Sequence, residues 1–259
     1  MRKFAIVSKD DKESASISRE IQKELFNSGL SYADSEPDIV CVVGGDGTFL
    51  SAIHKHIKRL DSVIFSGINT GTLGFFTDYT SDEVGQYIDD ILNREPEIEK
   101  KRLLRIKTRG ETNKNYLAVN EMRIENVIRT LIIDIMINDR KLETIRGTGL
   151  CICTQAGSTA FNRSLKGAIV EPGLDIMELT EIAGIHHSIY RSLEAPIILS
   201  GDKKLKLCGD FDESTLLCFD RFAINMKGVR EVECYLSDKT VSLAHFRPID
   251  YIDRLYHLF

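Results

Sequence analysis

The sequence predicts an α/β fold followed by an all-β domain, because the chain changes pattern near residue 97. Before that point, short apolar runs alternate with amphipathic helical segments, which is typical of a parallel sheet covered by helices. From residue 98 to 246, short strands separated by turn signals dominate, as in antiparallel sandwiches. We therefore predict a Rossmann-like α/β domain over 1–97, a C-terminal β-sandwich-like domain over 98–246, and a tail over 247–259 that packs back on the protein.

The composition is that of an ordinary globular chain, with 42% hydrophobic and 28% charged residues among 259. The net charge of −5 does not favour a nucleic-acid or membrane surface, so we predict neither partner. The apolar run Phe4–Val7 is too short for a signal peptide, and no stretch approaches the roughly 20 apolar residues of a membrane span.

The cysteines and histidines point to a reducing compartment and to packing roles. The six cysteines contain no C-x-x-C pair and lie mostly within apolar runs, so we predict reduced, buried thiols in a cytoplasmic protein. The histidine pairs His54/His56 and His186/His187 have no acidic or cysteine neighbour at metal-ligand spacing. We predict no transition-metal site.

In the first domain the periodicity predicts each element in turn. Strands are predicted at Phe4–Ser8, Ile39–Val43 and Val63–Ile68, which are short, apolar and rich in β-branched residues. A helix is predicted over Ser14–Ser28, because apolar residues recur there every four positions and Gly29 follows as a stop signal. Another begins at Ser81.

In the second domain turn signals separate ten predicted strands. They are Leu103–Lys107, Tyr116–Val119, Leu131–Ile137, Leu142–Arg146, Cys151–Thr154, Ile197–Leu199, Leu205–Cys208, Leu216–Phe219, Val232–Tyr235 and Thr240–Ala244. Two segments look helical, Ser158 to about Leu165 and Asp175–Ala183. The tail contains a short amphipathic segment over Tyr251–Leu258.

The strand Ile39–Val43 breaks into Gly44-Gly45-Asp46-Gly47, and a helical pattern begins at Thr48. Glycines let the backbone turn sharply and approach a ligand, and the N–H groups at a helix start suit phosphate. An aspartate would repel phosphate, but it suits a site that must take a proton from an attacking hydroxyl or hold a cation. The alternative is a strand–helix turn in which Asp46 is a simple cap.

Two further segments, one glycine-rich and one polar, lie at the ends of predicted strands. Asn69–Phe75 is a second glycine-rich loop, which alone is equally consistent with an ordinary loop. Asn120-Glu121 ends the predicted strand Tyr116–Val119, where an amide beside a carboxylate can read hydroxyls or the edge of a heterocycle. Exposed polar residues that close a strand are the alternative.

The remaining motifs lie in the β-rich domain. Arg146-Gly147-Thr148-Gly149 places a cation before a glycine pair. Gly157 and Ser158 read as a turn and N-cap, which would leave the N–H groups of Thr159 and Ala160 available at a helix start. A capped helix packed on the sandwich is the alternative.

Together these motifs resemble those of the NAD kinases of bacteria and eukaryotes. That family carries GGDG, an N-E/D pair and a G-S/T-T-A-Y-N-x-S stretch, which stand here as Gly44–Gly47, Asn120-Glu121 and Gly157–Ser164 in the same order. The resemblance spans about Phe4 to Phe246. GGDG alone is shared with diacylglycerol and sphingosine kinases and, loosely, with 6-phosphofructokinases, so the other two motifs are what select NAD kinase.

The resemblance implies an active site between the two domains, in which Asp46 takes the proton from the adenosine-ribose 2′-hydroxyl of NAD, which then attacks the γ-phosphate of ATP. It also implies phosphate contacts from the GGDG backbone, Mg²⁺ as the metal that accompanies ATP, NAD and ATP (or polyphosphate) as substrates, and a homodimer or homotetramer. The nucleotide-binding residues that it implies are Gly44, Gly45, Asp46, Gly47, Asn120, Glu121, Arg146, Thr148, Thr159, Ala160, Phe161, Asn162, Arg163, Ser164 and Ala183.

Two positions depart from the family pattern. Thr148 stands where relatives often carry aspartate, which removes a negative charge beside Arg146, and Phe161 stands where they carry tyrosine, which keeps a ring but removes a hydroxyl. Arg221 adds a cation that suits either a phosphate or the surface. Two rival functions are another GGDG kinase acting on a lipid or sugar phosphate, and a catalytically weak nucleotide-binding regulator. The absence of a membrane-facing apolar or basic stretch argues against a lipid kinase, and the intact Asp46 argues against the regulator.

Overall fold

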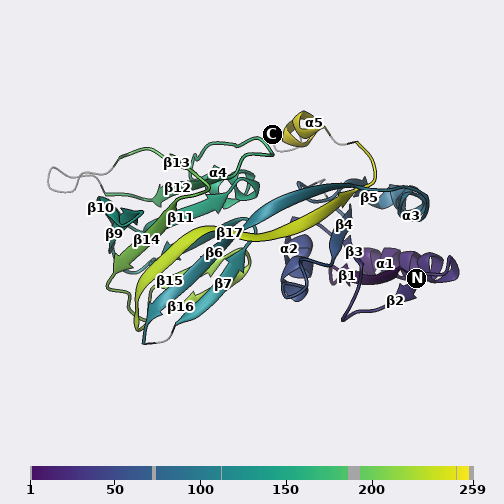
Figure 1. Cartoon of the computed structure of the whole chain (residues 1–259), viewed down its shortest axis with the longest axis horizontal. Coiled ribbons are helices and arrows are strands. Elements are labelled where there is room, and N and C mark those ends of the chain that lie inside the picture. The colour runs from purple at the N-terminus through teal and green to yellow at the C-terminus, as the bar shows by residue number, and fades with distance from the viewer. Residues whose placement is uncertain (1, 72–73, 112, 186–192, 249, 257–259) are drawn as a thin grey trace. The chain divides into compact units, whose positions relative to one another are not determined.

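The computed structural model describes residues 2–71, 74–111, 113–185, 193–248 and 250–256 (Figure 1). The chain forms two compact units. The first unit consists of Met1–Lys101 together with Lys239–Phe259, and the second consists of Arg102–Asp238. No helix in the described ranges is both long and apolar enough to cross a membrane.

The first unit is built on a parallel sheet with the strand order β2-β1-β3-β4-β17, in which β17 contributes only its C-terminal part. The strands are β1 (Lys3–Ser8), β2 (Ser31–Tyr32), β3 (Ile39–Val43), β4 (Ile64–Asn69) and β17 (Val229–His245), and the short β5 (Tyr79–Thr80) pairs with the end of β4. All five residues of β3 are buried, as expected for a central strand covered on both faces.

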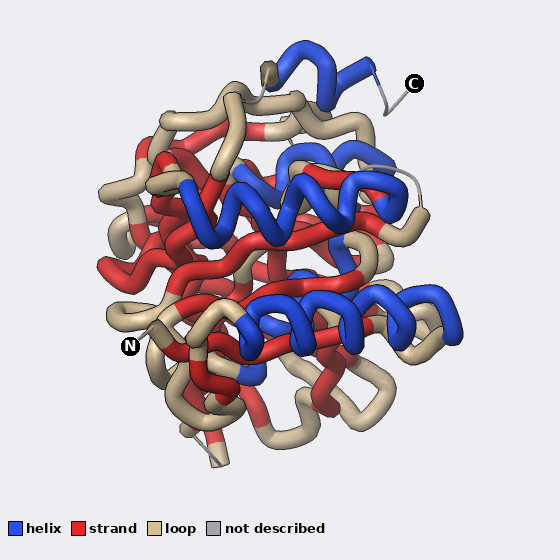
Figure 2. The backbone as a smooth tube through the Cα atoms, turned by 90° about the vertical axis from the view of Figure 1, so that its right-hand side faces the viewer, coloured by secondary structure: helices blue, strands red, loops and turns tan. Residues whose placement is uncertain are grey.

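Helices cover both faces of this sheet (Figure 2). Helices α1 (Lys12–Asn27) and α3 (Val84–Asn93) share one core with Cys41 and Ile68. Helix α2 (Asp46–Lys55) covers the opposite face, where Phe49 packs against Phe65 at 6.3 Å between ring centroids. The short elements η1 (Ser81–Glu83) and α5 (Tyr251–Tyr256) complete the unit. The strand–helix alternation predicted for this part of the chain is confirmed.

The second unit is a sandwich of two antiparallel sheets around one core. One sheet runs β10-β9-β14-β17, with β6 paired to β17 and β7, and the other runs β13-β12-β11-β8-β15-β16. The shared core contains Ile133 and Leu207 from the first sheet and Met122, Ile152 and Leu217 from the second. The strands are β6 (Glu97–Gly110), β7 (Lys114–Ala118), β8 (Glu121–Glu125), β9 (Leu131–Ile137), β10 (Arg140–Gly147), β11 (Gly149–Thr154), β12 (Ile176–Ile182), β13 (Ile197–Ser200), β14 (Lys204–Gly209), β15 (Leu216–Phe219) and β16 (Phe222–Asn225).

The structure corrects several predicted elements. The segment predicted as a helix over Asp175–Ala183 is strand β12, which pairs with β11 and β13. Ile176, Leu179 and Ile182 recur every three residues, which imitates the apolar face of a helix, although Met177-Glu178-Leu179-Thr180 alternates as a strand does. Strands β8 and β16 had no predicted counterpart. The helix predicted over Ser158–Leu165 is a 3₁₀ turn, η2 (Ala156–Thr159), followed by the single-turn helix α4 (Phe161–Ser164).

The last strand belongs to both units, because the two strands predicted over Val232–Tyr235 and Thr240–Ala244 are one continuous strand, β17. Its C-terminal part pairs in parallel with β4, through Ser242 opposite Ile64, so Lys239–Phe259 groups with the first unit. The domain boundaries predicted at 97 and 246 stay predictions, beside units that divide at 101 and 238.

Candidate active site

The glycine-rich turn after β3 leads directly into helix α2, which begins at Asp46, two residues earlier than predicted. Gly44 adopts a φ of +145°, and a Cβ there would lie 2.5 Å from the Thr48 hydroxyl, so only glycine fits. Gly45 is the N-cap residue and has no side chain to cap the helix. The turn therefore presents backbone rather than side chains at the start of α2, the arrangement that suits a phosphate.

The carboxylate of Asp46 is held by backbone amides of the loop that follows β4. The N–H of Phe75 donates to Oδ2 at 3.0 Å, and the N–H of Phe76 donates to Oδ1 at 3.1 Å. A Cβ at Gly74 would lie 2.2 Å from Asp46 Oδ1, so glycine is needed for the close approach. Asp46 is half-buried and is not a cap for its own helix. The interpretation of Asp46 as a simple cap is therefore wrong.

The second glycine-rich loop serves to orient this aspartate. Asn69, at the end of β4, accepts from the N–H of Gly71 at 2.8 Å and donates to the Thr77 hydroxyl at 3.2 Å. Thr72 and Leu73 lie outside the described residues. The loop then reaches the two amides that hold Asp46, so both glycine-rich loops meet at one carboxylate.

Buried charged groups connect this loop to the C-terminal segment of the first unit. Asp78 accepts from Arg254 at 2.5 Å through Oδ1 and contacts Nδ1 of His245 at 2.9 Å through Oδ2. Nε2 of His245 lies 3.4 Å from Glu99 Oε2. Arg247 forms a bidentate pair with Glu83 at 2.6 and 3.1 Å. These contacts of Arg247 and Arg254 lie within the first unit, and the tail predicted over 247–259 stays a prediction.

The network predicts that the stability of the protein falls at high pH. Burial by itself lowers the pKa of His245, but the hydrogen bonds with Asp78 and Glu99 raise it to about 9. A folded pKa above the unfolded value of about 6.5 stabilises the fold fully below pH 6.5, and this contribution is lost as the pH rises through about 9. We expect the free energy of unfolding to fall by up to about 3 kcal/mol over that window.

Urea denaturation across this pH range measures the loss, with the His245→Gln variant as the control because glutamine does not titrate. The difference in unfolding free energy between the two proteins should shrink as the pH rises. A difference that stays constant from about pH 6 to 10 would contradict the assignment of this pH dependence to His245.

In the second unit, Asn120 lies in the turn between β7 and β8, and Glu121 is the first residue of β8. Asp220 holds this turn, since its two carboxylate oxygens accept from the N–H groups of Val119 and Asn120, each at 2.8 Å. Thr154 binds the other side of the turn. Its N–H donates to the carbonyl oxygen of Asn120 at 2.8 Å, and its hydroxyl donates to the carbonyl oxygen of Val119 at 2.6 Å. These bonds use the backbone and leave both side chains available for another role.

Two polar atoms of this pair are buried and have no hydrogen-bond partner within the described part of the chain. They are Oδ1 of Asn120 and Oε2 of Glu121. Burial, followed by the charge of Asp220, raises the pKa of Glu121 to about 7, although Arg123 partly opposes the shift. Unsatisfied buried acceptors are costly, so a pair of them at one turn indicates a site that a ligand's donors complete. The alternative of exposed residues that close a strand is wrong.

Gly157 brings the next motif against this pair. A Cβ there would lie 2.1 Å from Asn120 O, so glycine alone allows the contact. The N–H of Ala160 donates to Gly157 O at 3.0 Å, which corrects the expectation that this amide is available. Ser158 is fully buried. Its hydroxyl donates to Gln155 O and accepts from the N–H of Val170, so it does not cap a helix. Thr159 and Ala160 are half-buried, and Ser164 is exposed.

The side chains of α4 divide between structure and surface. Asn162 is fully buried. Its side-chain nitrogen donates to the Glu178 carboxylate at 2.8 Å, and its side-chain oxygen accepts from the Thr180 hydroxyl at 2.8 Å. Both polar atoms therefore bond within the fold. The Phe161 ring is half-buried, and the guanidinium of Arg123 lies over one face of it, 3.8 Å from the ring centroid. One face of the ring is therefore occupied within the protein. Arg163 is half-buried.

The remaining predicted residues lie at the other end of β11. Thr148 precedes β11, its N–H donates to Ile182 O at 3.0 Å, and a Cβ at Gly147 would lie 2.9 Å from Ala183 O. Ala183 adopts a φ of +46° just after β12. Arg146 accepts at its carbonyl from Ile185. The six residues of β11 separate this group from the Asn120 turn by roughly 17 Å, so the fold of the second unit does not bring the two groups together.

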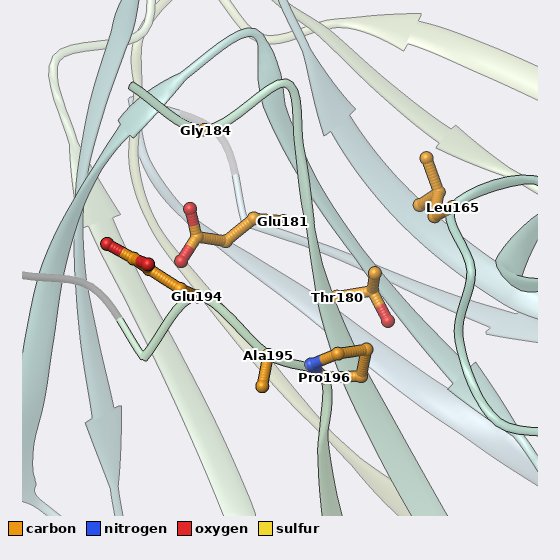
Figure 3. Close-up of a pocket in the computed structure, with 7 residues that line it drawn as sticks. All are labelled: Leu165, Thr180, Glu181, Gly184, Glu194, Ala195 and Pro196. Atoms are coloured by element: carbon orange, nitrogen blue, oxygen red, sulfur yellow. The ribbon is translucent and has the colours of Figure 1, made fainter. Parts of the chain in front are cut away.

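A pocket of about 160 Å³ lies near this second group. Its walls include Leu165 and Thr180, together with Glu181 and Glu194, whose side chains extend to the same side in Figure 3. Two carboxylates disfavour a phosphate ligand. We therefore assign no substrate to this pocket.

The structure also identifies positions that the sequence motifs did not. They are Asp220, which holds the Asn120 turn, Arg123, which stacks on Phe161, and the Phe75–Phe76 amides that hold Asp46. Asp220 adopts a φ of +47°, which aspartate tolerates better than most residues, but no local pattern in the sequence marks its partners. Arg221 follows Asp220 and is exposed.

Comparison with known proteins places this geometry in a family. Residues 7–96 match the model of the ATP-NAD kinase N-terminal domain, and residues 116–244 match that of the ATP-NAD kinase C-terminal domain. The NAD kinase of Geobacillus stearothermophilus is 34% identical over 97% of this chain and 94% of its own length. The NAD kinase 1 of Oceanobacillus iheyensis is 36% identical over 97% of this chain and 96% of its own.

Two solved structures share the fold. Yeast NADH kinase in complex with NADH has a TM-score of 0.86 and 18% identity, covering 99% of this chain and 86% of its own. An NAD kinase from Archaeoglobus fulgidus in complex with ATP has a TM-score of 0.79 and 21% identity, covering 99% of this chain and 98% of its own. A glycine turn with a held carboxylate, on an α/β unit joined to a β-sandwich, is the arrangement of a nucleotide phosphotransferase. The chain belongs to the NAD kinase family.

Proposed function

We propose that this protein is an ATP-dependent NAD kinase that phosphorylates the 2′-hydroxyl of the adenosine ribose of NAD and so forms NADP. The observation that carries the proposal is the Asp46 carboxylate, held by two backbone amides beside the glycine turn at the start of α2. Family membership over both domains supports the reaction class. The solved relatives hold NADH in one case and ATP in the other, which supports these two kinds of ligand.

Asp46 acts as the general base of this reaction. A secondary hydroxyl is a poor nucleophile at neutral pH, so an acceptor for its proton is needed as the oxygen attacks phosphorus. The two amides use two of the about four lone-pair sites of the carboxylate, which leaves acceptor capacity for the substrate hydroxyl. The amides also fix the orientation of the carboxylate, and the backbone of Gly44–Gly47 binds phosphate.

The Asn120–Glu121 turn binds the nucleoside of NAD. Ribose and adenine present hydroxyl and amino donors, and the two orphaned acceptors of this turn match them. Thr159, Ala160 and Phe161 lie on the motif that Gly157 brings against the turn. Asn162 supports this motif from within the fold, whereas Arg146, Thr148, Arg163, Ser164 and Ala183 stay predicted contacts.

The divalent cation accompanies the triphosphate. Within the described residues no group of three or more acidic, cysteine or histidine side chains forms a metal cage. Mg²⁺ often binds through phosphates, waters and only one or two carboxylates, so a single Asp46 beside the phosphate turn is compatible with it. When bound, the ion neutralises charge on the phosphates. ATP or polyphosphate as the phosphoryl donor, a cytoplasmic location and a homodimer or homotetramer are also expected.

A direct assay tests the reaction. Purified protein is incubated with Mg-ATP and NAD, and NADP is detected with an NADP-specific dehydrogenase. We expect NADP to form in proportion to enzyme and to require all three components. Phosphoryl transfer from ATP to a lipid or a sugar phosphate, with none to NAD, would favour the other GGDG kinases, and binding of both nucleotides without turnover would favour a regulator.

Phe161 provides a test of the acceptor site. If its second face stacks on a base of NAD, Phe161→Ala removes a contact of about 1–3 kcal/mol, the scale of base–aromatic stacking. We expect the Kd for NAD to rise about 5- to 150-fold, with ATP affected much less. Isothermal titration calorimetry measures both affinities.

Phe161→Tyr is the matched control, since it keeps the ring and restores the hydroxyl of relatives. NAD affinity should be unchanged or modestly tighter, because a well-placed neutral hydrogen bond contributes about 0.5–1.5 kcal/mol. A large loss of thermal stability in Phe161→Ala with unchanged NAD affinity would instead make the ring, together with Arg123, a packing feature.

A further inference from the structure

The C-terminal helix α5 places one cation against the loop that orients Asp46. Arg254 is 9% exposed, so its guanidinium is nearly withdrawn from water. Its Nη1 donates to the carbonyl oxygen of Phe75, and its Nη2 donates to Asp78 Oδ1 at 2.5 Å. All of these residues belong to the first unit. The contact joins positions that are 179 residues apart in the sequence.

The two contacts of this loop meet on a single peptide group. The carbonyl of Phe75 and the N–H of Phe76 belong to the same planar amide. Arg254 holds the carbonyl end, and Asp46 Oδ1 accepts from the N–H end at 3.1 Å. A rotation of this peptide plane would break both bonds at once. A cation on the carbonyl also polarises the amide and strengthens the bond that its N–H donates.

Arg254 is itself held in place by its second contact. Asp78 is 5% exposed, and its other oxygen lies 2.9 Å from His245 Nδ1. The remaining charged groups around it are Glu99, 3.4 Å from His245 Nε2, and Arg247, which donates to the carbonyl of Asp78. The guanidinium is thus fixed between a carboxylate and a peptide carbonyl, a geometry that suits its planar fork and that an ammonium group cannot reproduce.

We propose that Arg254 is a positioning residue for the phosphoryl-transfer reaction, which clamps the Phe75–Phe76 peptide so that its amide holds the Asp46 carboxylate toward the acceptor hydroxyl. Helix α5 thus acts on the reaction only through Arg254, which contacts neither substrate. The inference rests on the proposed role of Asp46 as general base.

A double-mutant cycle in single-turnover experiments tests this inference. Arg254→Met keeps the length of the side chain and removes its donors. We expect the rate of the chemical step to fall about 100-fold, since a misplacement of about 1 Å costs that much, while NAD and ATP affinities stay within about threefold. In the Asp46→Asn background the same change should cost less than about threefold, because there is no base left to position.

The outcomes separate the inference from the proposed function. If Arg254→Met slows the chemical step equally in the wild-type and Asp46→Asn backgrounds, the positioning role is overturned and the kinase assignment stays intact. The same holds if Arg254→Met alone stays within about threefold of the wild-type rate. An Asp46→Asn protein with wild-type rate would remove the general base and the inference with it. Asp253→Asn is the matched control, an exposed position on the same helix, and should leave the rate unchanged.

Arg254→Lys keeps the test open if the methionine variant does not fold. Lysine retains the charge but cannot hold Phe75 O and Asp78 together, so the chemical step should slow about tenfold. In protein labelled with ¹⁵N-phenylalanine, the amide proton of Phe76 should move upfield in this variant, in the direction produced by Asp46→Asn. An unmoved Phe76 resonance with an unchanged rate would overturn the proposal.

Discussion

Replacing Asp46 by asparagine is expected to lower kcat about 10²–10⁴-fold, the usual contribution of a positioned general base. The amide cannot accept the proton of the attacking hydroxyl at neutral pH. NAD and ATP affinities should change little, because the phosphate and nucleoside contacts proposed here come from other groups. Steady-state kinetics and calorimetry on the same preparation separate these quantities.

The hydrogen bonds of Asp46 predict a second effect of this change. Both of its oxygens accept from backbone amides, whereas asparagine offers one oxygen and one amide donor. One N–H of Phe75 or Phe76 then loses its acceptor, which costs about 1–3 kcal/mol of unfolding free energy. The control is Asp89→Asn, which removes an exposed carboxylate on α3. A value of kcat within about threefold of wild type for Asp46→Asn would exclude Asp46 from the mechanism.

Replacing Glu121 by glutamine is expected to weaken NAD binding while stabilising the fold. A hydrogen bond to a charged acceptor contributes about 1.5–3 kcal/mol, so the Kd for NAD should rise roughly 10- to 150-fold, with a smaller effect on ATP. Equal losses for the two ligands would show that this turn does not belong to the acceptor nucleotide.

The raised pKa of Glu121 determines how both effects depend on pH. Its burial and the nearby Asp220 raise the folded pKa to about 7 from an ordinary value of 4.5. A raised carboxylate pKa means that stability is lost as the pH rises from about 4.5 through 7, because the buried group must ionise. At pH 8 the glutamine variant should therefore be more stable by up to about 3 kcal/mol, and the difference should vanish near pH 4.

NAD affinity of the wild type should rise over the same range, because only the ionised carboxylate accepts from two donors. Calorimetry between about pH 6 and 8, with Glu121→Gln as the non-titrating control, measures this slope. A wild-type affinity that is flat with pH would mean that Glu121 does not bind as the anion.

Local patterns predicted most of the elements because they depend on neighbouring residues. Strand β9 has the predicted bounds Leu131–Ile137, and helix α1 lies within two residues of its predicted start and one of its end. The failures occur where distant partners override the pattern. In β12 the pairing with β11 and β13 overrides a helix-like spacing of Ile176, Leu179 and Ile182, and Asn162 and the N–H of Ala168 satisfy the buried Glu178.

The candidate site divides in the same way. Asp46, Asn120 and Glu121 are recognisable from their neighbours in the chain, since a glycine turn or a strand end is a local feature. Their surroundings are not. The backbone amides that hold the Asp46 carboxylate lie 29 and 30 residues further along the chain. The Asp220 carboxylate that accepts from the N–H of Asn120 lies 100 residues away.

By itself the sequence determined the alternation of strands and helices in the first unit, the glycine turn that carries Asp46 and the resemblance to NAD kinases, because each depends on residues close together in the chain. Only the tertiary structure decided which groups hold that carboxylate, that Asn162 serves the fold, that one face of Phe161 is covered by Arg123, and that Arg254 reaches the loop beside Asp46. These features arise when sheets and helices bring together amides and charges from distant segments. No local pattern specifies that register.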